Sequence, residues 1–137
     1  MEAPLVSARE STARVRVRYA ETDKMGVVYY ANYLVWFEVA RCEWLRVTGC
    51  TYRELEDEGI VLPVIEAHCE YRRPLRYDEE VEIRTRATLL SPVRLRFDYE
   101  VAPAGGEPAA AGWTIHAGID PDGRPRRLPQ TLRSLFE

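Results

Sequence analysis

One acidic residue, Asp23, lies in a turn-forming segment between a strand-like run and a long apolar stretch (residues 19–33, YAETDKMGVVYYANY). A carboxylate there can face the free backbone amides at the start of a helix, where negative charge that develops on a substrate is stabilised. Asp23 is therefore a candidate for hydrolytic chemistry, either as a general base or as a nucleophile that forms a mixed anhydride. The alternative is that Asp23 only caps the helix, which contributes about 1 kcal/mol.

The residues after Asp23 shape this candidate site. Gly26 permits a close approach of the backbone, and Val27 and Val28 lie between the acid and the helix. Asn32, in the first helical turn, is predicted either to hydrogen-bond the Asp23 turn or to be an ordinary polar residue at a helix start. Tyr33 falls on the apolar side of the helix and is predicted to lie in the core.

Glu38 and Glu43 are alternative acids on the helix. Each has an arginine three residues later, Arg41 and Arg46 respectively. Because residues three apart are neighbours on a helix surface, ion pairing is the preferred interpretation of both glutamates.

The histidines and cysteines do not indicate a metal site. His68 and His116 both fall on the polar side of a predicted strand, as structural or exposed residues. Cys42, Cys50 and Cys69 are odd in number and match no C-x-x-C spacing, so neither structural zinc nor a disulfide framework is expected. Cys42 has no base beside it and is predicted to be inert. We expect no metal and a cytoplasmic protein.

The elements that position Asp23 follow from hydrophobic periodicity. Residues 1–12 lack periodicity and are predicted to form a flexible tail. Residues 13–19 alternate, with Val15, Val17 and Tyr19 on one face, and predict a strand. Residues 28–48 follow a helical pattern that ends at Gly49. This helix is apolar on most sides, so it is expected to be largely enclosed.

Four further strands are predicted beyond a short helix, which opens with a capping box at Thr51 and ends near Gly59. The first, over residues 64–72, is less regular than the three that follow, over 80–89, 93–101 and 109–119. For the last of these the pattern predicts an inward face made of Ala109, Ala111, Trp113, Ile115, Ala117 and Ile119. Residues 102–108 form the hairpin loop, and residues 131–136 form a helical turn or a docked tail. The order predicts a single α+β domain over residues 13–137, with the sheet packed on the helix.

Composition narrows the class of protein. The chain has 137 residues, of which 46% are hydrophobic, and a formal net charge of −3. This balance argues against a nucleic-acid binder, which is usually basic. No apolar run approaches the ~20 residues of a membrane span, and residues 1–10 lack the hydrophobic core of a signal peptide.

The segment from Asp23 to Tyr33 resembles the hotdog-fold acyl-CoA thioesterases of the 4-hydroxybenzoyl-CoA thioesterase type, including the Tol-Pal-associated branch. The resemblance extends over nearly the whole chain. It implies a curved antiparallel sheet of about five strands wrapped around one long central helix. It also implies that Asp23 is catalytic, and that the backbone N–H of Tyr30 polarises the thioester carbonyl. Many relatives carry histidine where this chain has Tyr30. The substrate-binding residues implied are Gly26, Val27, Val28, Tyr29 and Asn32.

The resemblance further implies hydrolysis of a small or medium acyl-CoA, aliphatic or aromatic, without a cofactor. Arginine suits recognition of the coenzyme A phosphates. Three groups are candidates: Arg72, Arg73 and Arg76; Arg84, Arg86, Arg94 and Arg96; and Arg124, Arg126 and Arg127. For most of these arginines, pairing with neighbouring acids on a solvated face is the preferred interpretation. The alternatives are an acyl carrier protein thioesterase and a non-catalytic acyl-CoA-binding protein. A homodimer is the expected minimal unit and a homotetramer the expected assembly.

Overall fold

The computed structural model describes residues 5–136 and has an α+β architecture. Its strands are β1 (Leu5–Arg16), β2 (Val64–Tyr71), β3 (Glu80–Ser91), β4 (Arg94–Pro103) and β5 (Ala110–Ala117). Its α-helices are α1 (Asn32–Thr48), α2 (Tyr52–Asp57) and α3 (Gln130–Arg133), with 3-10 turns η1 (Tyr19–Glu21) and η2 (Ser134–Phe136). The strands form one five-stranded sheet in the order β1-β3-β4-β5-β2, and every neighbouring pair is antiparallel, as predicted.

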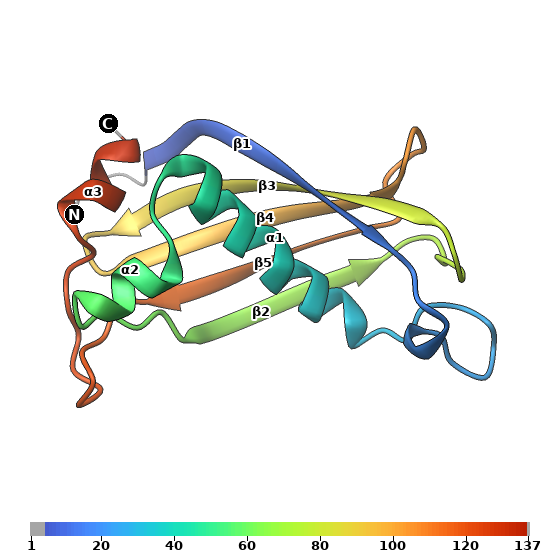
Figure 1. Cartoon of the computed structure of the whole chain (residues 1–137), viewed down its shortest axis with the longest axis horizontal. Coiled ribbons are helices and arrows are strands. Elements are labelled where there is room, and N and C mark those ends of the chain that lie inside the picture. Colours follow the sequence, from blue (N-terminus) through green and yellow to red (C-terminus); the bar gives the residue numbers. More distant parts are fainter. Residues whose placement is uncertain (1–4, 137) are drawn as a thin grey trace.

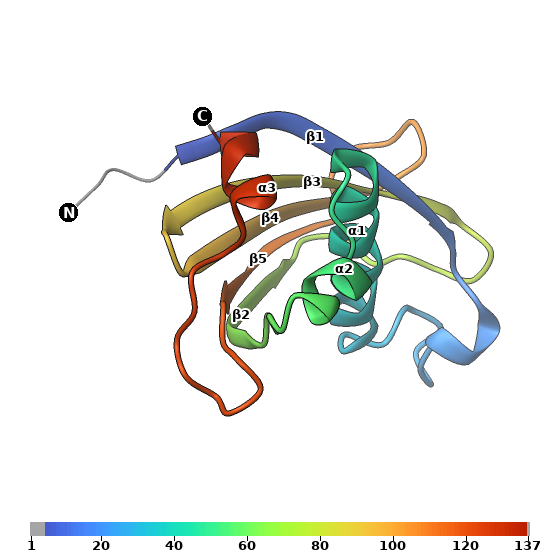
Figure 2. The ribbon, with the colours of Figure 1, turned by 60° about the vertical axis from the view of Figure 1, so that its left-hand side comes forward.

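Helix α1 has 17 residues and packs across one face of the sheet (Figures 1 and 2). Its buried side includes Trp36, Phe37 and Trp44, each at most 2% exposed. Phe37 stacks on Tyr99 of β4 at 4.2 Å, and Trp44 meets Phe97 edge-to-face at 5.6 Å. Large aromatic side chains contribute roughly 2–3 kcal/mol each when fully buried. The contact between α1 and the sheet is therefore the main core of the protein.

The first strand begins earlier than the sequence predicts. Residues 5–16 form β1, which pairs with β3 from Leu5↔Leu89 to Arg16↔Glu80 with a register shift between Val6 and Glu10. The predicted tail was therefore wrong for residues 5–12, while residues 1–4 lie outside the described residues. The irregular register explains the missing alternation. Tyr19, which was predicted to point inward from this strand, lies in η1 and is 78% exposed.

The predicted inward face of β5 was also wrong. The buried positions of β5 on the α1 side are Ala110, Gly112, Thr114 and His116. Of the residues predicted to point inward, Ala109 and Ile115 are buried, whereas Ala111, Trp113, Ala117 and Ile119 are only partly buried. A Cβ atom at Gly112 would lie within 2.8 Å of the Phe37 ring, so only glycine lets α1 approach there. Because the inner face carries the polar Thr114 and His116 and the outer face carries Trp113 and Ile115, alternation of polarity selected the wrong face.

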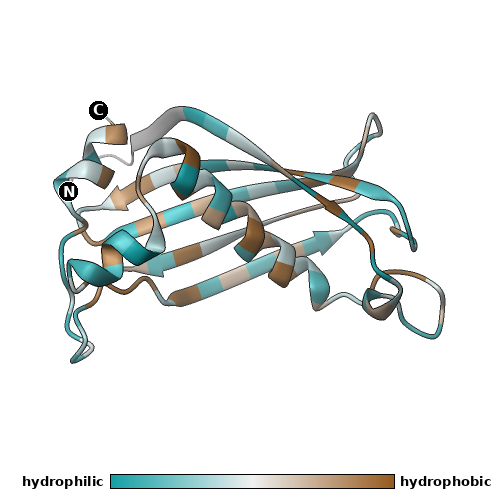
Figure 3. Ribbon diagram, in the orientation of Figure 1, coloured by the Kyte–Doolittle hydropathy of each residue, from teal (hydrophilic) through white to brown (hydrophobic). Residues whose placement is uncertain are grey.

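Helix α1 is less enclosed than its composition predicts. The apolar side chains of Leu34, Val35, Val39 and Val47 are all at least 42% exposed. Figure 3 shows bands of apolar residues around this helix. The sheet covers one side of α1 only, so an apolar strip remains open on the isolated chain.

The remaining helices follow the prediction. Thr51 caps α2 by accepting a hydrogen bond from the Glu54 N–H at 3.2 Å. At the carboxyl end, Leu132 and Phe136 are buried, and the Phe136 ring lies 6.0 Å from Trp44. Among the helices of residues 5–136, none is long and apolar enough to cross a lipid bilayer.

Candidate active site

Asp23 organises a tight turn at the end of the sheet remote from α3 and η2 (Figure 1). Its N–H donates to Val27 O at 2.8 Å, and its carbonyl accepts from the Gly26 N–H at 2.9 Å. Its side-chain Oδ1 accepts from the N–H groups of Met25 at 2.9 Å and Val27 at 3.4 Å. The Asp23 carboxylate is thus fixed through one oxygen, and within residues 5–136 the other oxygen has no hydrogen-bond partner.

Gly26 has a φ of +81°, a conformation that glycine adopts without strain. A Cβ atom there would meet no other atom within 4 Å. Gly26 is therefore required by the turn itself, and not by crowding within this chain.

The residues that flank the turn are tied to their surroundings by short strand-like contacts. Thr22 bridges Val28, and Val27 bridges Arg76. The Val28 N–H donates to Leu75 O at 2.8 Å. Val28 is buried, so it supports the turn through packing. The predicted helix start at Val28 was wrong, because the β-branched pair lies in extended bridges and α1 begins only at Asn32.

Glu21 is a site-building residue that the sequence did not reveal. Its carboxylate is buried, with Oε1 accepting from the Arg18 N–H at 2.8 Å and Oε2 from the Trp36 indole N–H at 3.0 Å. Its backbone carbonyl accepts from the Tyr29 N–H and from the Asn32 side-chain amide, both at 2.8 Å. Glu21 therefore fastens the segment just before Asp23 to the start of α1.

Two backbone amides at the start of α1 are free. The Tyr29 N–H is taken by Glu21, but within the described residues neither Tyr30 nor Ala31 has an acceptor for its N–H. Ala31 is the N-cap of α1 and offers no capping side chain. Unpaired N–H groups at a helix start carry partial positive charge and attract a negative group. Position and polarity together make this helix start suitable for an oxyanion.

Asn32 donates to the Asp23-bearing segment through Glu21, as one of its two predicted roles requires. The carbonyl of Tyr30 accepts from the Tyr71 hydroxyl at 3.0 Å. Tyr33 is buried, as predicted, and its ring meets that of Tyr71 edge-to-face at 4.9 Å. Burial raises the pKa of Tyr33 to about 12, so it stays a neutral packing group near neutral pH. The Tyr71 contact orients the peptide between Tyr30 and Ala31, whereas the peptide that carries the Tyr30 N–H is held at its carbonyl by the Asn32 N–H at 2.9 Å.

The predicted site residues lie along one segment and differ in how far their side chains are exposed. Gly26 and Tyr29 are exposed, Asp23, Val27 and Asn32 are partly buried, and Val28 is buried. The proposed role of Asp23 as a helix cap is not observed, because Asp23 caps its own turn and Ala31 is the N-cap.

The two alternative acids differ in their environment. Glu43 pairs with Arg46 at 3.0 Å, as predicted. Among the described residues Glu38 has no ion pair with Arg41. The Arg41 Nε instead donates to the Tyr52 hydroxyl at 3.1 Å. The predicted Glu38–Arg41 pair was therefore wrong, because the arginine is held by α2.

The other reactive residue types lie away from the turn. His116 is fully buried between Thr114 and Leu62 O, and burial lowers its pKa to about 4. His68 stacks on Trp113 with 4.1 Å between ring centroids. Burial raises the pKa of the Cys50 thiol to about 11 and also raises that of Cys42. No group of metal-binding side chains occurs within residues 5–136.

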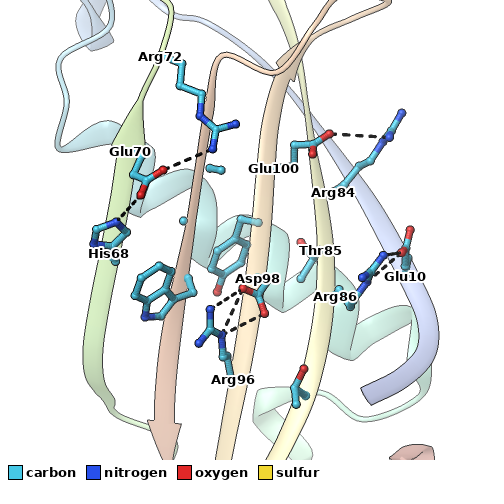
Figure 4. Close-up of a pocket in the computed structure, with 15 residues that line it drawn as sticks. Glu10, His68, Glu70, Arg72, Arg84, Thr85, Arg86, Arg96, Asp98 and Glu100 are labelled. Carbon is cyan, nitrogen blue, oxygen red and sulfur yellow. Dashed lines mark hydrogen bonds and ion pairs between the residues drawn. The ribbon is translucent and has the colours of Figure 1, made fainter. Parts of the chain in front are cut away.

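A hollow of about 610 Å³ lies on the face of the sheet opposite α1 (Figure 4). It contains none of the residues predicted around Asp23, but four of the arginines considered for phosphate recognition line it: Arg72, Arg84, Arg86 and Arg96. Its charged side chains are paired with each other: Arg86 with Glu10 at 2.6 Å, Arg96 with Asp98 at 2.9 Å, and Arg84 with Glu100 at 3.9 Å. This face is balanced in charge, as the solvated-face interpretation predicts.

Arg76 differs from these paired arginines. It bridges Val27 beside the Asp23 turn, it is exposed, and within the described residues its guanidinium has no ion-pair partner. Its neighbour Arg73 pairs with Glu107 at 2.6 Å. Of the three arginine groups, the one that contains Arg76 therefore lies next to the turn.

Known proteins are similar to this chain in sequence and architecture. Residues 17–136 match the family model described as the thioesterase-like superfamily. The chain is 32% identical over 124 residues to the acyl-CoA thioester hydrolase YbgC of Escherichia coli O6:H1, covering 90% of this chain and 92% of that protein. It is also 32% identical over 124 residues to the 1,4-dihydroxy-2-naphthoyl-CoA hydrolase of Synechococcus elongatus, covering 88% and 90% respectively. The solved DHNA-CoA thioesterase of Staphylococcus aureus superposes with a TM-score of 0.83 at 38% identity, covering 87% of this chain and 80% of that one.

Proposed function

This chain belongs to the thioesterase-like superfamily, and we propose that it is an acyl-CoA thioesterase in which Asp23 and the Tyr30 N–H act on the thioester. Asp23 either attacks the thioester carbonyl or removes a proton from the attacking water. The Tyr30 N–H donates to the carbonyl oxygen as it becomes an oxyanion. Collapse of the tetrahedral intermediate breaks the carbon–sulfur bond and releases coenzyme A as the thiolate, which takes up a proton. The general-base route yields the free acid directly, whereas in the nucleophilic route water then hydrolyses the aspartyl anhydride to release the acid and restore Asp23.

The observation that carries this proposal is the free Tyr30 N–H at the start of α1. The two amides before it are committed, since Val28 donates to Leu75 and Tyr29 donates to Glu21. The same backbone segment carries the free oxygen of Asp23. A donor and an acid without internal partners, placed on one short segment, are the two groups that hydrolysis requires.

The thiol of coenzyme A is a good leaving group, because its intrinsic pKa resembles that of a cysteine side chain, about 8.5. Little acid assistance is needed when the carbon–sulfur bond breaks. We therefore expect turnover without a metal or redox cofactor.

Arg76 is our candidate for contact with the coenzyme A phosphates. It is an exposed cation beside the turn, and arginine binds phosphate through several parallel hydrogen bonds. The same cation suits the acidic surface of acyl carrier protein, which stays the second candidate thioester carrier. A non-catalytic acyl-CoA-binding role is the third candidate, and the unpartnered acid argues against it.

We propose that two copies of the chain form the functional unit. Strand β2 lies at the sheet edge and carries the exposed Val64 and Ile65. The open apolar strip of α1, which includes Val35 and Val39, adds to this surface. An unpaired edge strand beside exposed apolar residues favours pairing with a second copy. The tetramer is a further assembly of such dimers.

The acyl group is proposed to be small or medium, because the bulky residues of α1 fill the core under the helix. Trp36, Phe37 and Trp44 leave no exposed surface there. The relatives from Synechococcus elongatus and Staphylococcus aureus are named for an aromatic acyl-CoA. Aromatic thioesters are therefore included among the substrates to be tested.

The proposal is tested by release of free thiol from short-chain, medium-chain, long-chain and aromatic acyl-CoA thioesters. A parallel set presents the same acyl groups on acyl carrier protein. We expect efficient turnover of at least one acyl-CoA. Turnover of the carrier-protein thioesters alone would favour the second candidate, and binding without turnover in either set would favour the third.

A further inference from the structure

Arg41 occupies an unusual position for a charged residue on a helix. It is held between α1, α2 and the sheet, where its Nε donates to the Tyr52 hydroxyl at 3.1 Å and its guanidinium interacts with the Tyr99 phenol. Burial alone lowers the pKa of Arg41, but the interactions with both phenols outweigh it and leave the pKa raised. Arg41 therefore stays charged.

Among residues 5–136, Arg41 forms no ion pair with a carboxylate. Every ion pair formed by residues 5–136 involves another arginine or a histidine, and Glu38 one turn earlier is exposed. The polar chain beyond Tyr99 is neutral. The Tyr99 hydroxyl lies 2.6 Å from Thr114 Oγ1, which lies 2.9 Å from His116 Nε2. Burial keeps His116 uncharged by lowering its pKa to about 4.

A half-buried cation without a counter-ion is costly, and an incoming anion would recover part of that cost. Arginine offers a planar fork of donors that matches a carboxylate. Tyr52 and Tyr99 occupy part of that fork and hold its orientation. The local chemistry therefore suits a carboxylate ligand.

The position of Arg41 relates this ligand to the proposed site. Arg41 follows Tyr30 by eleven residues, which at about 100° per residue returns to within about 20° of the same side of the helix. The distance along the axis from Asn32, the first residue of α1, to Arg41 is roughly 13 Å. The thioester carbonyl at the Tyr30 N–H lies just before this stretch, so an acyl group that extends along α1 brings its far end toward Arg41.

The edge strand β2 carries small side chains on the face of the sheet that α1 covers. On β2, Ala67 and Cys69 lie opposite Thr114 and Gly112 of β5, whose side faces α1. These are small side chains, and Ala67 is exposed.

We propose that Arg41 binds a carboxylate at the end of the acyl group remote from the thioester, so that the preferred substrates are acyl-CoAs with an acidic tail. This inference rests on the proposed function. It adds a class of acyl group and a specificity residue to that function.

The test compares kcat/KM for octanoyl-CoA and suberoyl-CoA, which share a chain length and differ in the terminal carboxylate. Wild type should prefer suberoyl-CoA, and Arg41→Met should lower the suberoyl-to-octanoyl ratio about 10- to 100-fold. Arg41→Lys keeps a positive charge but lacks the planar fork of donors. Its suberoyl-to-octanoyl ratio should lie between those of wild type and Arg41→Met. Arg46→Met removes an exposed arginine of the same helix, and we expect it to leave the ratio unchanged.

The outcomes separate this inference from the proposed function. If wild type hydrolyses neither thioester nor any other of the acyl-CoA panel, the proposed function fails. The Kd values of Asp23→Asn for the two thioesters then show whether a carboxylate preference exists in binding. Equal kcat/KM of wild type on both thioesters overturns the inference. Parallel loss on both thioesters in Arg41→Met, with a changed oligomeric mass, assigns Arg41 to assembly and also overturns it. If Arg41→Met does not fold, the wild-type ratio and Arg41→Lys decide.

Discussion

Asp23 and Asp120 occupy the same place in two turns of the same geometry. In each, the aspartate N–H donates to the carbonyl four residues on, at 2.8 Å and 2.9 Å respectively, and the aspartate carbonyl accepts from a glycine at 2.9 Å. Each Oδ1 accepts from the N–H groups two and four residues on. The glycines, Gly26 and Gly123, have φ values of +81° and +85°. The chain therefore carries an internal control for what an aspartate does by shaping a turn alone.

What distinguishes the two turns is the segment that follows. The Asp23 turn leads to the free amides of Tyr30 and Ala31 at the start of α1. The Asp120 turn leads through Pro125 and Pro129 to the short α3. The turn geometry alone is thus no argument for catalysis, and the proposed role of Asp23 rests on its surroundings.

Glu21→Gln tests the support of the site. An amide cannot accept from both the Arg18 N–H and the Trp36 indole N–H, because one of its ends is a donor. We expect a loss of about 1–3 kcal/mol in the free energy of unfolding and a fall in kcat. Chemical denaturation and steady-state kinetics measure the two effects. Glu43→Gln, which breaks the exposed pair with Arg46, is the matched control and should cost no more than about 0.5 kcal/mol. Equal effects of the two variants would contradict the assigned role.

Gly26→Val tests the conformation of the turn. A β-branched residue is strained at a φ of +81°, so we expect a loss of about 1–2 kcal/mol in stability together with reduced activity. Gly26→Asn should cost less, since asparagine tolerates the left-handed region. Gly123→Val should lower stability comparably and spare kcat/KM. If Gly26→Val left both stability and turnover unchanged, the turn would not be needed in its observed form.

His116 makes stability depend on pH. Its ordinary pKa of 6.5 applies to the unfolded chain, whereas burial lowers the folded value to about 4. The unfolded state therefore binds more protons between these values, and stability falls as the pH drops from about 6.5 towards 4, by up to roughly 3 kcal/mol. Denaturation midpoints across this range should vary less in His116→Gln than in wild type. If His68→Gln, and not His116→Gln, flattened the dependence of stability on pH, the assignment of this effect to His116 would be contradicted.

The proposed dimer is tested on the open strip of α1. Val35 and Val39 are 50% and 43% exposed in the single chain. The double variant Val35→Glu/Val39→Glu should shift the sedimenting species from dimer or tetramer towards monomer, because charge is excluded from an apolar contact. Circular dichroism checks that the fold is retained. A wild type that is monomeric at micromolar concentration, or an unchanged mass of the variant, would contradict the proposed interface.

The sequence predicted the elements whose faces differ in polarity. Strands β3 and β4 alternate cleanly, and their inward residues Val81, Ile83, Leu95 and Phe97 are fully buried. The sequence also predicted the Thr51 cap of α2, because helix capping depends only on residues that are close in the sequence. Local signals of this kind do not require knowledge of the rest of the fold.

The errors arose where long-range contacts decide. The inner face of β5 is selected by Phe37 packing on Gly112, and alternation cannot show that contact. Arg41 has the i+3 spacing of a surface pair, yet Tyr52 of α2 holds it. Glu21 was missed because a buried carboxylate looks the same in sequence as an exposed one. In each case the deciding partner is distant in the sequence.

The most direct test of the catalytic role of Asp23 is to measure thiol release from the acyl-CoA panel by wild type, Asp23→Asn and Asp120→Asn. Asparagine keeps the Oδ1 acceptor in both turns, so both variants should fold with similar stability. We predict a loss of about 10²- to 10⁴-fold in kcat for Asp23→Asn, with acyl-CoA binding retained, and wild-type turnover for Asp120→Asn. Turnover by Asp23→Asn at the level of Asp120→Asn would contradict the catalytic role and leave Asp23 as a turn-forming residue only.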